Sequence, residues 1–300
     1  MIDLKKLQTE SNNLNTKNID NLDTIDILKL INEEDKIVPQ KVESALPQIE
    51  ALVDELTISM KKGGRLIYTG AGTSGRIGLL DSVECPPTYG VDPSLVICLM
   101  AGGDSAFAYA KEGAEDDKEQ AILDLKKIKP TKNDFLVGIA ASGRTPYVLS
   151  MVEYAEKIGM KTGCIVNTLN SPLASLVDFP IEVETGAEVI SGSTRMKAGT
   201  AQKLVCNMIS TAVMIKLGHV YQNYMIDLRA TNEKLHARQL SIISNICEIE
   251  KEEAKELLNK HQTVKKALLA YFTKIEDNEI LEEMLQKSEN NLRKAIENND

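Results

Sequence analysis

The sequence of 300 residues contains no tryptophan, only 4% aromatic residues and only three histidines. Its cysteines are odd in number, and none is spaced as a Cys-x-x-Cys pair: Cys85, Cys98, Cys164, Cys206 and Cys247. This scatter argues against a disulfide framework and against a zinc site, which needs closely spaced thiolates or imidazoles. We therefore expect a chain without a metal site.

Long apolar runs and positive charge are also missing. No apolar run approaches the roughly 18 residues of a membrane span, and the N-terminal MIDLKKLQTESNN lacks the apolar core of a signal peptide. We therefore expect a cytoplasmic location and no membrane partner. A formal charge of -9 disfavours nucleic-acid binding, which needs a basic face. A small anionic substrate is compatible with this charge, because a few focused cations and backbone N–H groups outweigh a diffuse negative surface.

The pattern along the chain predicts an α/β fold. Residues 1–22 are polar and predict an irregular arm, and apolar residues recur at helical spacing over 24–62. Apolar strands then alternate with helices, which predicts a parallel sheet covered on both faces. The expected strands are 66–69, 95–100, 135–140, 162–166 and 180–183, and the expected helices are 76–83, 115–127, 145–158 and 172–176. A long buried helix over 197–217 precedes a helical C-terminal part. We expect an N-terminal arm with helices (1–54), an α/β domain (55–220) and a helical domain (221–300).

The segment Gly70-Ala71-Gly72-Thr73-Ser74-Gly75 follows the first expected strand and fits G-x-G-x-x-G. This pattern alone is weak evidence for a dinucleotide site. The acidic residue that a ribose needs about 20 residues later is poorly placed here, because Asp104 comes after the next strand has ended. The hydroxyls of Thr73 and Ser74 suit a compact phosphate monoester, and a helix N-terminus would add free N–H groups and a positive dipole. We favour the monoester.

The same Ser-Gly-Arg occurs again as Ser142-Gly143-Arg144, followed by Thr145, after another expected strand. Two such turns at the carboxyl ends of parallel strands could face one crevice, the usual ligand site of an open α/β sheet. The alternative is a pair of tight strand-to-helix turns, with glycine at positive φ and serine as the N-cap.

A third hydroxyl-rich segment, residues 186–200, opens the long helix and offers Ser191 and Ser193 beside Arg195 and Lys197. It predicts a further part of the anion site. The alternative is a capping segment in which Ser191, Ser193 or Thr194 is the N-cap.

Two glutamates are candidates for acid/base chemistry. Glu84 precedes Cys85-Pro86-Pro87, and the prolines are expected to end the helix and hold the carboxylate on a rigid corner. Partial burial there would raise the pKa of Glu84 and suit a general acid near neutral pH. Glu115 lies at an expected helix start, where acidic residues also occur for purely structural reasons. The alternative for each residue is a solvated surface glutamate.

Four stretches together resemble the bacterial N-acetylmuramic acid 6-phosphate etherases, which contain a sugar isomerase (SIS) domain. The stretches are GAGTSGRIGLLDSVECPPTYG from Gly70, GIAASGRTPYV from Gly138, ISGSTRMKAGTAQKLVCNMIST from Ile190 and DLRATNEKLHARQ from Asp227. The resemblance runs from about Thr9 to Gln239 and is fainter beyond.

This resemblance implies a flavodoxin-like SIS three-layer sandwich with a central parallel sheet, a homodimer, and no metal or redox cofactor. It implies that the C3 D-lactyl ether of N-acetylmuramic acid 6-phosphate is cleaved by elimination and water addition, in cell-wall recycling. Glu84 matches the family's proton donor, and Glu115 matches its second catalytic glutamate. The phosphate would contact the three glycine- and hydroxyl-rich segments at Thr73, Ser74, Gly75, Ser142, Gly143, Thr145, Ser191 and Ser193.

Other functions are also compatible with such a chain. SIS modules also occur in sugar-phosphate sensors without catalysis, but the sensors that regulate transcription usually carry a basic N-terminal DNA-binding segment. Residues 1–62 are not conspicuously basic, and both glutamates are present, so we favour catalysis. An aldose–ketose phosphate isomerase would share the proton transfer at C2 without releasing lactate, and a dinucleotide oxidoreductase is the least favoured alternative.

Overall fold

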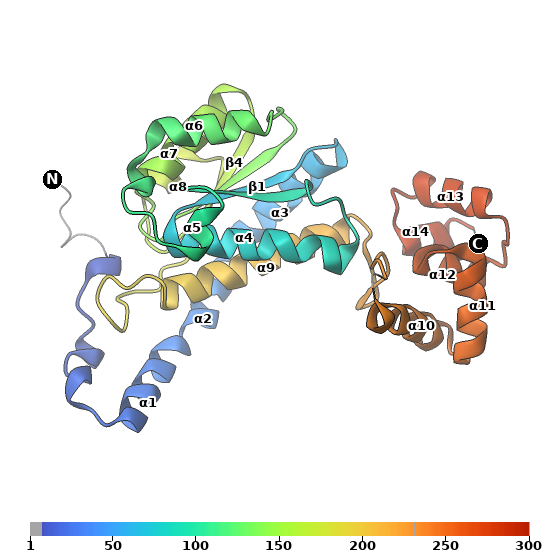
Figure 1. Cartoon of the computed structure of the whole chain (residues 1–300), viewed down its shortest axis with the longest axis horizontal. Coiled ribbons are helices and arrows are strands. Elements are labelled where there is room, and N and C mark those ends of the chain that lie inside the picture. Colours follow the sequence, from blue (N-terminus) through green and yellow to red (C-terminus); the bar gives the residue numbers. More distant parts are fainter. Residues whose placement is uncertain (1–7, 231, 300) are drawn as a thin grey trace. The chain divides into compact units, whose positions relative to one another are not determined.

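The computed structural model describes residues 8–230 and 232–299 (Figure 1). The chain forms two compact units, one from the chain up to Val83 together with Ser94–Ser210, and the other from Glu84–Pro93 and the chain from Thr211 onward. The expected boundaries at 54/55 and 220/221 stay predictions. The arm expected over 1–22 lies partly outside the described residues.

The described part of this arm contains three single turns of 3-10 helix: η2 (Gln8–Glu10), η3 (Leu14–Thr16) and η4 (Ile19–Asn21). The helical stretch expected over 24–62 is confirmed as three helices: α1 (Thr24–Asp35), α2 (Val38–Glu43) and α3 (Leu46–Lys61). A proline stands in the first turn of both α2 and α3. Proline suits that position because it has no N–H to donate and its φ is already helical, so Pro39 and Pro47 favour new helix starts.

The core of the first unit is a parallel sheet in the order β2-β1-β3-β4-β5. Its strands are β1 (Leu66–Gly70), β2 (Val96–Met100), β3 (Phe135–Ile139), β4 (Lys161–Val166) and β5 (Phe179–Glu182), each within one residue of the expected bounds. In the register of β1 with β3, Gly70 pairs with Ile139. The two Ser-Gly-Arg segments therefore follow neighbouring strands at the same edge of the sheet.

Helices cover both faces of this sheet, which confirms the three-layer α/β sandwich (Figure 1). One face carries α7 (Pro146–Lys157) and α8 (Pro172–Leu176), with α6 (Lys118–Lys127) packed on α7. The other face carries α3, α4 (Gly72–Tyr89) and α9 (Lys197–Lys216). Gly138 of β3 lets α7 approach closely, because a Cβ there would lie 2.8 Å from Cγ1 of Val148.

The prediction that Pro86-Pro87 end their helix is wrong, because α4 contains both prolines and ends at Tyr89. Each proline costs the helix an N–H donor and crowds the preceding turn, at roughly 3 kcal/mol or more. The last turns of α4 are held by packing instead, since Cys85 and Tyr89, four residues apart on one helix face, are both buried. The helix stops at Gly90, whose φ of +67° favours glycine and whose N–H donates to the Pro86 carbonyl.

The second unit has its own hydrophobic core, which confirms the helical C-terminal part. It contains α10 (Glu233–Cys247), α11 (Lys251–His261), α12 (Val264–Thr273), α13 (Asn278–Lys287) and α14 (Leu292–Glu297). A short hairpin that the sequence did not predict, β6 (Val220–Tyr221) with β7 (Tyr224–Met225), precedes these helices. Among all the described helices, none has the length and apolar character that crossing a membrane would require.

A buried ion pair joins the amino ends of β1 and β3. The Asp134 carboxylate accepts hydrogen bonds from the backbone N–H, Nε and Nη2 of Arg65 and from the N–H of Thr131, over 2.8 to 3.0 Å. Burial acts to raise the pKa of Asp134, but the bonds from Arg65 and Thr131 hold it below its ordinary value.

We expect Asp134→Asn to lower the free energy of unfolding by about 3 kcal/mol at pH 7, because it leaves the Arg65 guanidinium without its buried partner. The pKa of Asp134 is lower in the folded protein than in the unfolded chain, where it is about 4. The contribution of Asp134 to the free energy of unfolding is therefore complete above the unfolded-state pKa, and it is lost as the pH falls through the folded-state pKa. The difference between the two proteins should therefore shrink in acid, as measured by urea unfolding at pH 7 and below pH 4. Asp26→Asn, which removes an exposed pair with Lys29, should change stability by less than about 1 kcal/mol. Equal losses in both variants at pH 7 would contradict this assignment.

Candidate active site

The first glycine-rich segment forms the N-terminus of α4. The helix begins at Gly72, four residues earlier than expected, so Thr73, Ser74 and Gly75 occupy its first turn. N–H groups in a first turn have no partner within the helix, and they lie at the positive end of its dipole. The N–H of Gly75 already donates to the Ala71 carbonyl, and a Cβ on Gly75 would lie 2.7 Å from the Gly70 carbonyl oxygen. The missing side chain of Gly75 therefore allows α4 to lie close to the end of β1, while Thr73 and Ser74 carry the two hydroxyls that are candidates for binding a phosphate.

The second segment forms a tight turn between β3 and α7. Gly143 has a φ of +62°, its N–H donates to the Ala140 carbonyl, and a Cβ there would clash with Oγ of Ser171. Only glycine fits this position. Ser142 is half-buried, and Thr145 immediately precedes α7. Because β3 lies beside β1, the structure brings this turn and the N-terminus of α4 to the same edge of the sheet.

The third segment leads into α9, and the N-terminus of that helix is capped by a residue that the sequence did not indicate. The Glu188 carboxylate, and not a serine or threonine, accepts the N–H groups of Lys197 and Ala198 at the start of α9, each at 2.9 Å. Burial raises the pKa of Glu188, an effect that these two hydrogen bonds oppose. The alternative interpretation, in which Ser191, Ser193 or Thr194 is the N-cap, does not describe these two N–H groups, because the Glu188 carboxylate accepts both of them.

Lys197 is also unavailable as a cation for a ligand. Its side chain is 2% exposed, and its Nζ donates to the Glu34 carboxylate at 2.7 Å. Burial acts to raise the pKa of Glu34, but hydrogen bonds from Lys197, Asn15 and Asn13 hold it below the ordinary value. This cluster ties α9 to α1 and the N-terminal arm.

Ser191 and Ser193 lie in a connection that contacts the N-terminal arm. Oγ of Ser191 donates to Oδ1 of Asn12 at 3.2 Å, and the N–H of Gly192 donates to the Thr9 carbonyl. Helix α9, which follows this connection, lies close to the first glycine-rich segment. A Cβ on Gly199 of α9 would lie 3.4 Å from Cγ2 of Thr73. The first turns of α4 and α9 are therefore neighbours, and the two serines precede that contact.

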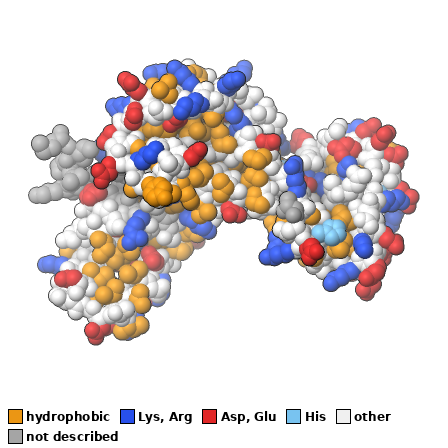
Figure 2. Space-filling model, in the orientation of Figure 1, with side chains coloured by type: hydrophobic (Ala, Val, Ile, Leu, Met, Phe, Trp, Pro, Cys, Tyr) orange, Lys and Arg blue, Asp and Glu red, His pale blue; other side chains and the backbone are white. Residues whose placement is uncertain are grey.

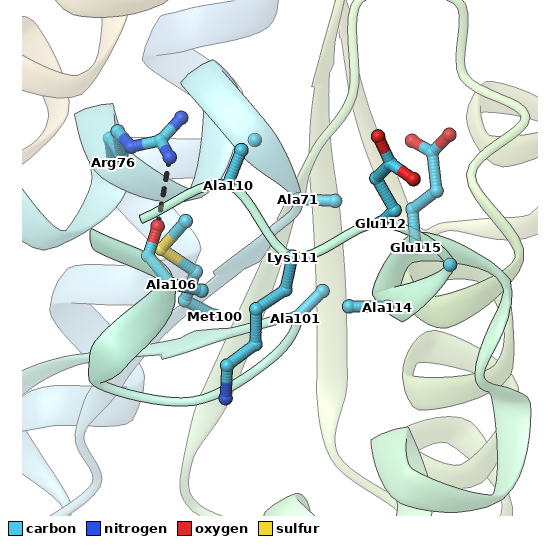
Figure 3. A pocket seen from close by; sticks show the side chains of 12 residues that line it. Ala71, Arg76, Met100, Ala101, Ala106, Ala110, Lys111, Glu112, Ala114 and Glu115 are labelled. Carbon is cyan, nitrogen blue, oxygen red and sulfur yellow. Dashed lines mark hydrogen bonds between the residues drawn. The ribbon is translucent and has the colours of Figure 1, made fainter. Parts of the chain in front are cut away.

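Glu115 lines a cavity of about 150 Å³ next to the start of α4 (Figure 3). It belongs to the 3-10 turn η5 (Ala114–Asp116), and α6 begins only at Lys118, so the expected helix start at Glu115 is wrong. The reason is that Asp117 is the N-cap of α6 and accepts the N–H of Gln120. The side chain of Glu115 is exposed, and Figure 3 shows its carboxylate on the same side as that of Glu112.

Three charged residues of this cavity were not among the predicted site residues: Arg76, Lys111 and Glu112. Arg76 belongs to the repeated Ser-Gly-Arg, and that repetition could have identified it. Lys111 and Glu112 lie in a connection without periodicity, where the sequence carries no comparable signal.

Glu84 lies in the second compact unit, near the end of α4. Its side chain is exposed, so the partial burial that would raise the pKa of a general acid is not provided by the single chain. The end of the helix is well fixed nevertheless. The hydroxyls of Tyr89 and Thr211 are 3.4 Å apart, and a Cβ on Gly90 would overlap the carbonyl oxygen of Asp227.

Across residues 8–230 and 232–299, no three His, Cys, Asp or Glu side chains cluster as a metal ion would require. The candidate residues offer hydroxyls, helix N-terminal N–H groups and carboxylates. Such a set can bind a phosphate monoester and transfer protons next to it.

Comparison with known proteins shows similarity along most of the chain. Residues 48–156 match the glucokinase regulatory protein N-terminal SIS domain, and residues 222–289 match the C-terminal lid domain of glucokinase regulatory protein. A protein of Halalkalibacterium halodurans named N-acetylmuramic acid 6-phosphate etherase is 53% identical over 90% of this chain and 91% of its own length. Proteins of the same name from Geobacillus thermodenitrificans and Escherichia coli O1:K1 / APEC are each 47% identical, over 98% and 99% of this chain and 100% and 99% of their own lengths.

Proposed function

This chain belongs to the family of N-acetylmuramic acid 6-phosphate etherases, and on that premise we propose that it is a carbon–oxygen lyase. It cleaves the C3 D-lactyl ether of N-acetylmuramic acid 6-phosphate and yields N-acetylglucosamine 6-phosphate and D-lactate, in cell-wall recycling. The observation that carries this proposal is identity of 47–53% to proteins of that name over 90–99% of the chain. The expected cytoplasmic location stays a prediction.

Incubation of the purified protein with N-acetylmuramic acid 6-phosphate, followed by enzymatic detection of D-lactate, tests the proposal directly. We expect D-lactate and N-acetylglucosamine 6-phosphate in equal amounts. Tight binding of the sugar phosphate without turnover would indicate a sensor, and a new ketose phosphate without lactate would indicate an isomerase.

The chemistry requires two proton-transfer groups. An ether oxygen is a poor leaving group, but opening of the sugar ring makes C1 an aldehyde and acidifies the proton on C2. A base then removes that proton while an acid protonates the departing lactate oxygen, and water adds to the resulting unsaturated aldehyde. We assign the acid to Glu84 and the proton at C2, or the incoming water, to Glu115. Each such group contributes roughly 10²–10⁴-fold to the rate.

The phosphate would occupy the edge where the N-terminus of α4 and the β3–α7 turn meet. There it would accept hydrogen bonds from Thr73 and Ser74 on one side and from Ser142, Gly143 and Thr145 on the other. Ser191 and Ser193 precede the neighbouring first turn of α9 and would contribute from the third side. Gly75 supports this arrangement through the close approach of α4 to β1.

We expect Ser142→Ala to raise the KM for N-acetylmuramic acid 6-phosphate by about 10-fold or more, because a hydrogen bond to a charged oxygen is worth about 1.5–3 kcal/mol. The thermal midpoint should change little, since Ser142 is half-buried and lies in a turn. Steady-state kinetics measure the effect. Ser175→Ala is the matched control, because the Ser175 hydroxyl donates to the carbonyl of Ser171, the N-cap of α8. An unchanged KM for Ser142→Ala would remove Ser142 from the phosphate site.

The position of Glu84 on α4 favours a homodimer as the active form. It follows Thr73 by 11 residues on one continuous helix, which is about 16 Å along the axis at 1.5 Å per residue. That distance exceeds the reach of a single sugar whose phosphate lies at Thr73. Glu84 is exposed, and Leu80 and Val83 on the same side of α4 are 47% and 54% exposed. We propose that a second copy covers this face and that each Glu84 acts at the phosphate site of the other copy.

A second apolar area is consistent with a partner copy. Figure 2 shows apolar side chains gathered over α1, where Ile25 and Leu28 are 58% and 56% exposed. Residues three apart share one helix face, so these two form a continuous apolar strip. Exposed apolar strips of this kind commonly mark protein interfaces.

A further inference from the structure

The two cations that line the Glu115 cavity are both bound to main-chain carbonyls. Nε of Arg76 donates to the Phe107 carbonyl at 2.9 Å, and Nη2 donates to the Ala106 carbonyl at 2.8 Å, as Figure 3 shows for the second bond. These carbonyls belong to α5 (Ser105–Ala108), a single turn in which the Ser105 carbonyl accepts the Tyr109 N–H. The carbonyls of Ala106 and Phe107 lie in the last turn of the helix, where no N–H of the helix itself is available to them. A planar guanidinium presents donors on separate nitrogens in a fixed fork, so Nε and Nη2 each bond one carbonyl, whereas an ammonium has all its donors on a single nitrogen.

Residues 102–114, which contain α5 and immediately precede Glu115, contact one another across the loop. Nζ of Lys111 donates to the Gly102 carbonyl at 2.7 Å. Gly102 has a φ of +86°, and a Cβ there would lie 3.0 Å from Cβ of Ala106 and 3.3 Å from Cβ of Ala114. The start, middle and end of residues 102–114 are therefore packed together. Because Gly102 packs between Ala106 and Ala114, a displacement of α5 would also move Ala114 and the next residue, Glu115.

Arg76 lies on α4 only two residues after Ser74. Its guanidinium thus connects the helix turn that carries the proposed phosphate ligands to the loop that carries the proposed base. We propose that Arg76 is a positioning residue, which holds the Glu115 loop at a fixed distance from the N-terminus of α4. This inference rests on the proposed function for its kinetic consequences, but its structural consequence can be measured without any substrate.

We expect Arg76→Ala to reduce kcat for D-lactate release by about 10²-fold, because a small misplacement of a catalytic group has an effect of that size. The dissociation constant for N-acetylglucosamine 6-phosphate, measured by calorimetry, should stay unchanged, since the phosphate ligands remain. In Arg76→Lys, kcat should lie between those of the unaltered protein and Arg76→Ala, because an ammonium keeps the charge and can donate to the carbonyls but lacks the rigid fork that fixes their positions. Guanidinium ion added to Arg76→Ala should restore part of kcat, whereas the same addition to Ser142→Ala should restore nothing.

Amide hydrogen exchange in the substrate-free protein provides the independent readout. Residues 102–117 should exchange faster in Arg76→Ala than in the unaltered protein, while β1 and β3 remain protected. Faster exchange in a protein that releases no D-lactate would leave the loop-holding role intact and refute only the proposed function. Unchanged exchange together with a weakened dissociation constant would overturn the proposal and make Arg76 a direct ligand of the phosphate. An unchanged kcat in an active enzyme would overturn it as well.

Discussion

Replacing Glu84 by glutamine should reduce the rate of D-lactate release by about 10²–10⁴-fold, the usual contribution of a general acid or base. Glutamine has nearly the same size and cannot donate a proton to the departing ether oxygen. The side chain is exposed at the end of α4, so the fold should be unaffected. Initial rates with N-acetylmuramic acid 6-phosphate measure the loss, and the thermal midpoint verifies folding. Full D-lactate release by this variant would remove Glu84 from the mechanism.

The same variant tests whether Glu84 acts within its own chain. Equal amounts of Glu84→Gln and Glu115→Gln, unfolded and refolded together, should regain about a quarter of the unaltered activity if each Glu84 serves the other copy of a two-fold dimer. Half of the dimers would then be mixed, and each mixed dimer would contain one intact site. No regain of activity in mixed dimers would show that Glu84 and Glu115 act from the same chain. A combined Leu80→Ser, Val83→Ser variant should weaken the dimer, as sedimentation would show.

Replacing Glu115 by glutamine should also reduce D-lactate release by about 10²–10⁴-fold, but through a different step. If Glu115 handles the proton on C2, exchange of that proton with solvent deuterium should disappear in Glu115→Gln and continue in Glu84→Gln. Nuclear magnetic resonance of the recovered sugar phosphate measures this exchange. Exchange that survives in Glu115→Gln and stops in Glu84→Gln would reverse the two roles.

Glu112 provides the matched comparison for Glu115, because both line the same cavity and both are exposed. We expect Glu112→Gln to have a much smaller effect on the rate than Glu115→Gln. A larger loss in Glu112→Gln would mean that the base was assigned to the wrong carboxylate of this loop.

The positions and lengths of the strands along the chain followed from the sequence, because short apolar runs separated by helical periodicity have few other interpretations. The start of α4 did not, since Gly72 and Gly75 discourage helix in isolation. Contact with β1 and β2 compensates, because Gly75 fits only where its missing side chain leaves room for the Gly70 carbonyl and Met100. The helix end differed for a similar reason. Burial of Cys85 and Tyr89 outweighs the local effect of Pro86 and Pro87.

The capping of α9 shows the same limit. Serine and threonine are good N-caps by local propensity, but the folded chain places Glu188, nine residues before Lys197, under the first N–H groups of the helix. Likewise, the sequence presents Lys197 as a cation near a possible anion site. Only the fold reveals that Glu34, 163 residues away, already binds it.

The sequence by itself determined the class of fold and the two hydroxyl-bearing turns, because strand and helix periods and glycine spacing are local properties of the chain. The roles predicted for the two glutamates came from the resemblance to a known family. The tertiary structure decided what those residues are next to. It placed the two turns on neighbouring strands, brought the Arg76 guanidinium within hydrogen-bond distance of two carbonyls of α5, and left Glu84 exposed. These relations depend on which surfaces are buried against each other, and burial is a property of the folded chain as a whole.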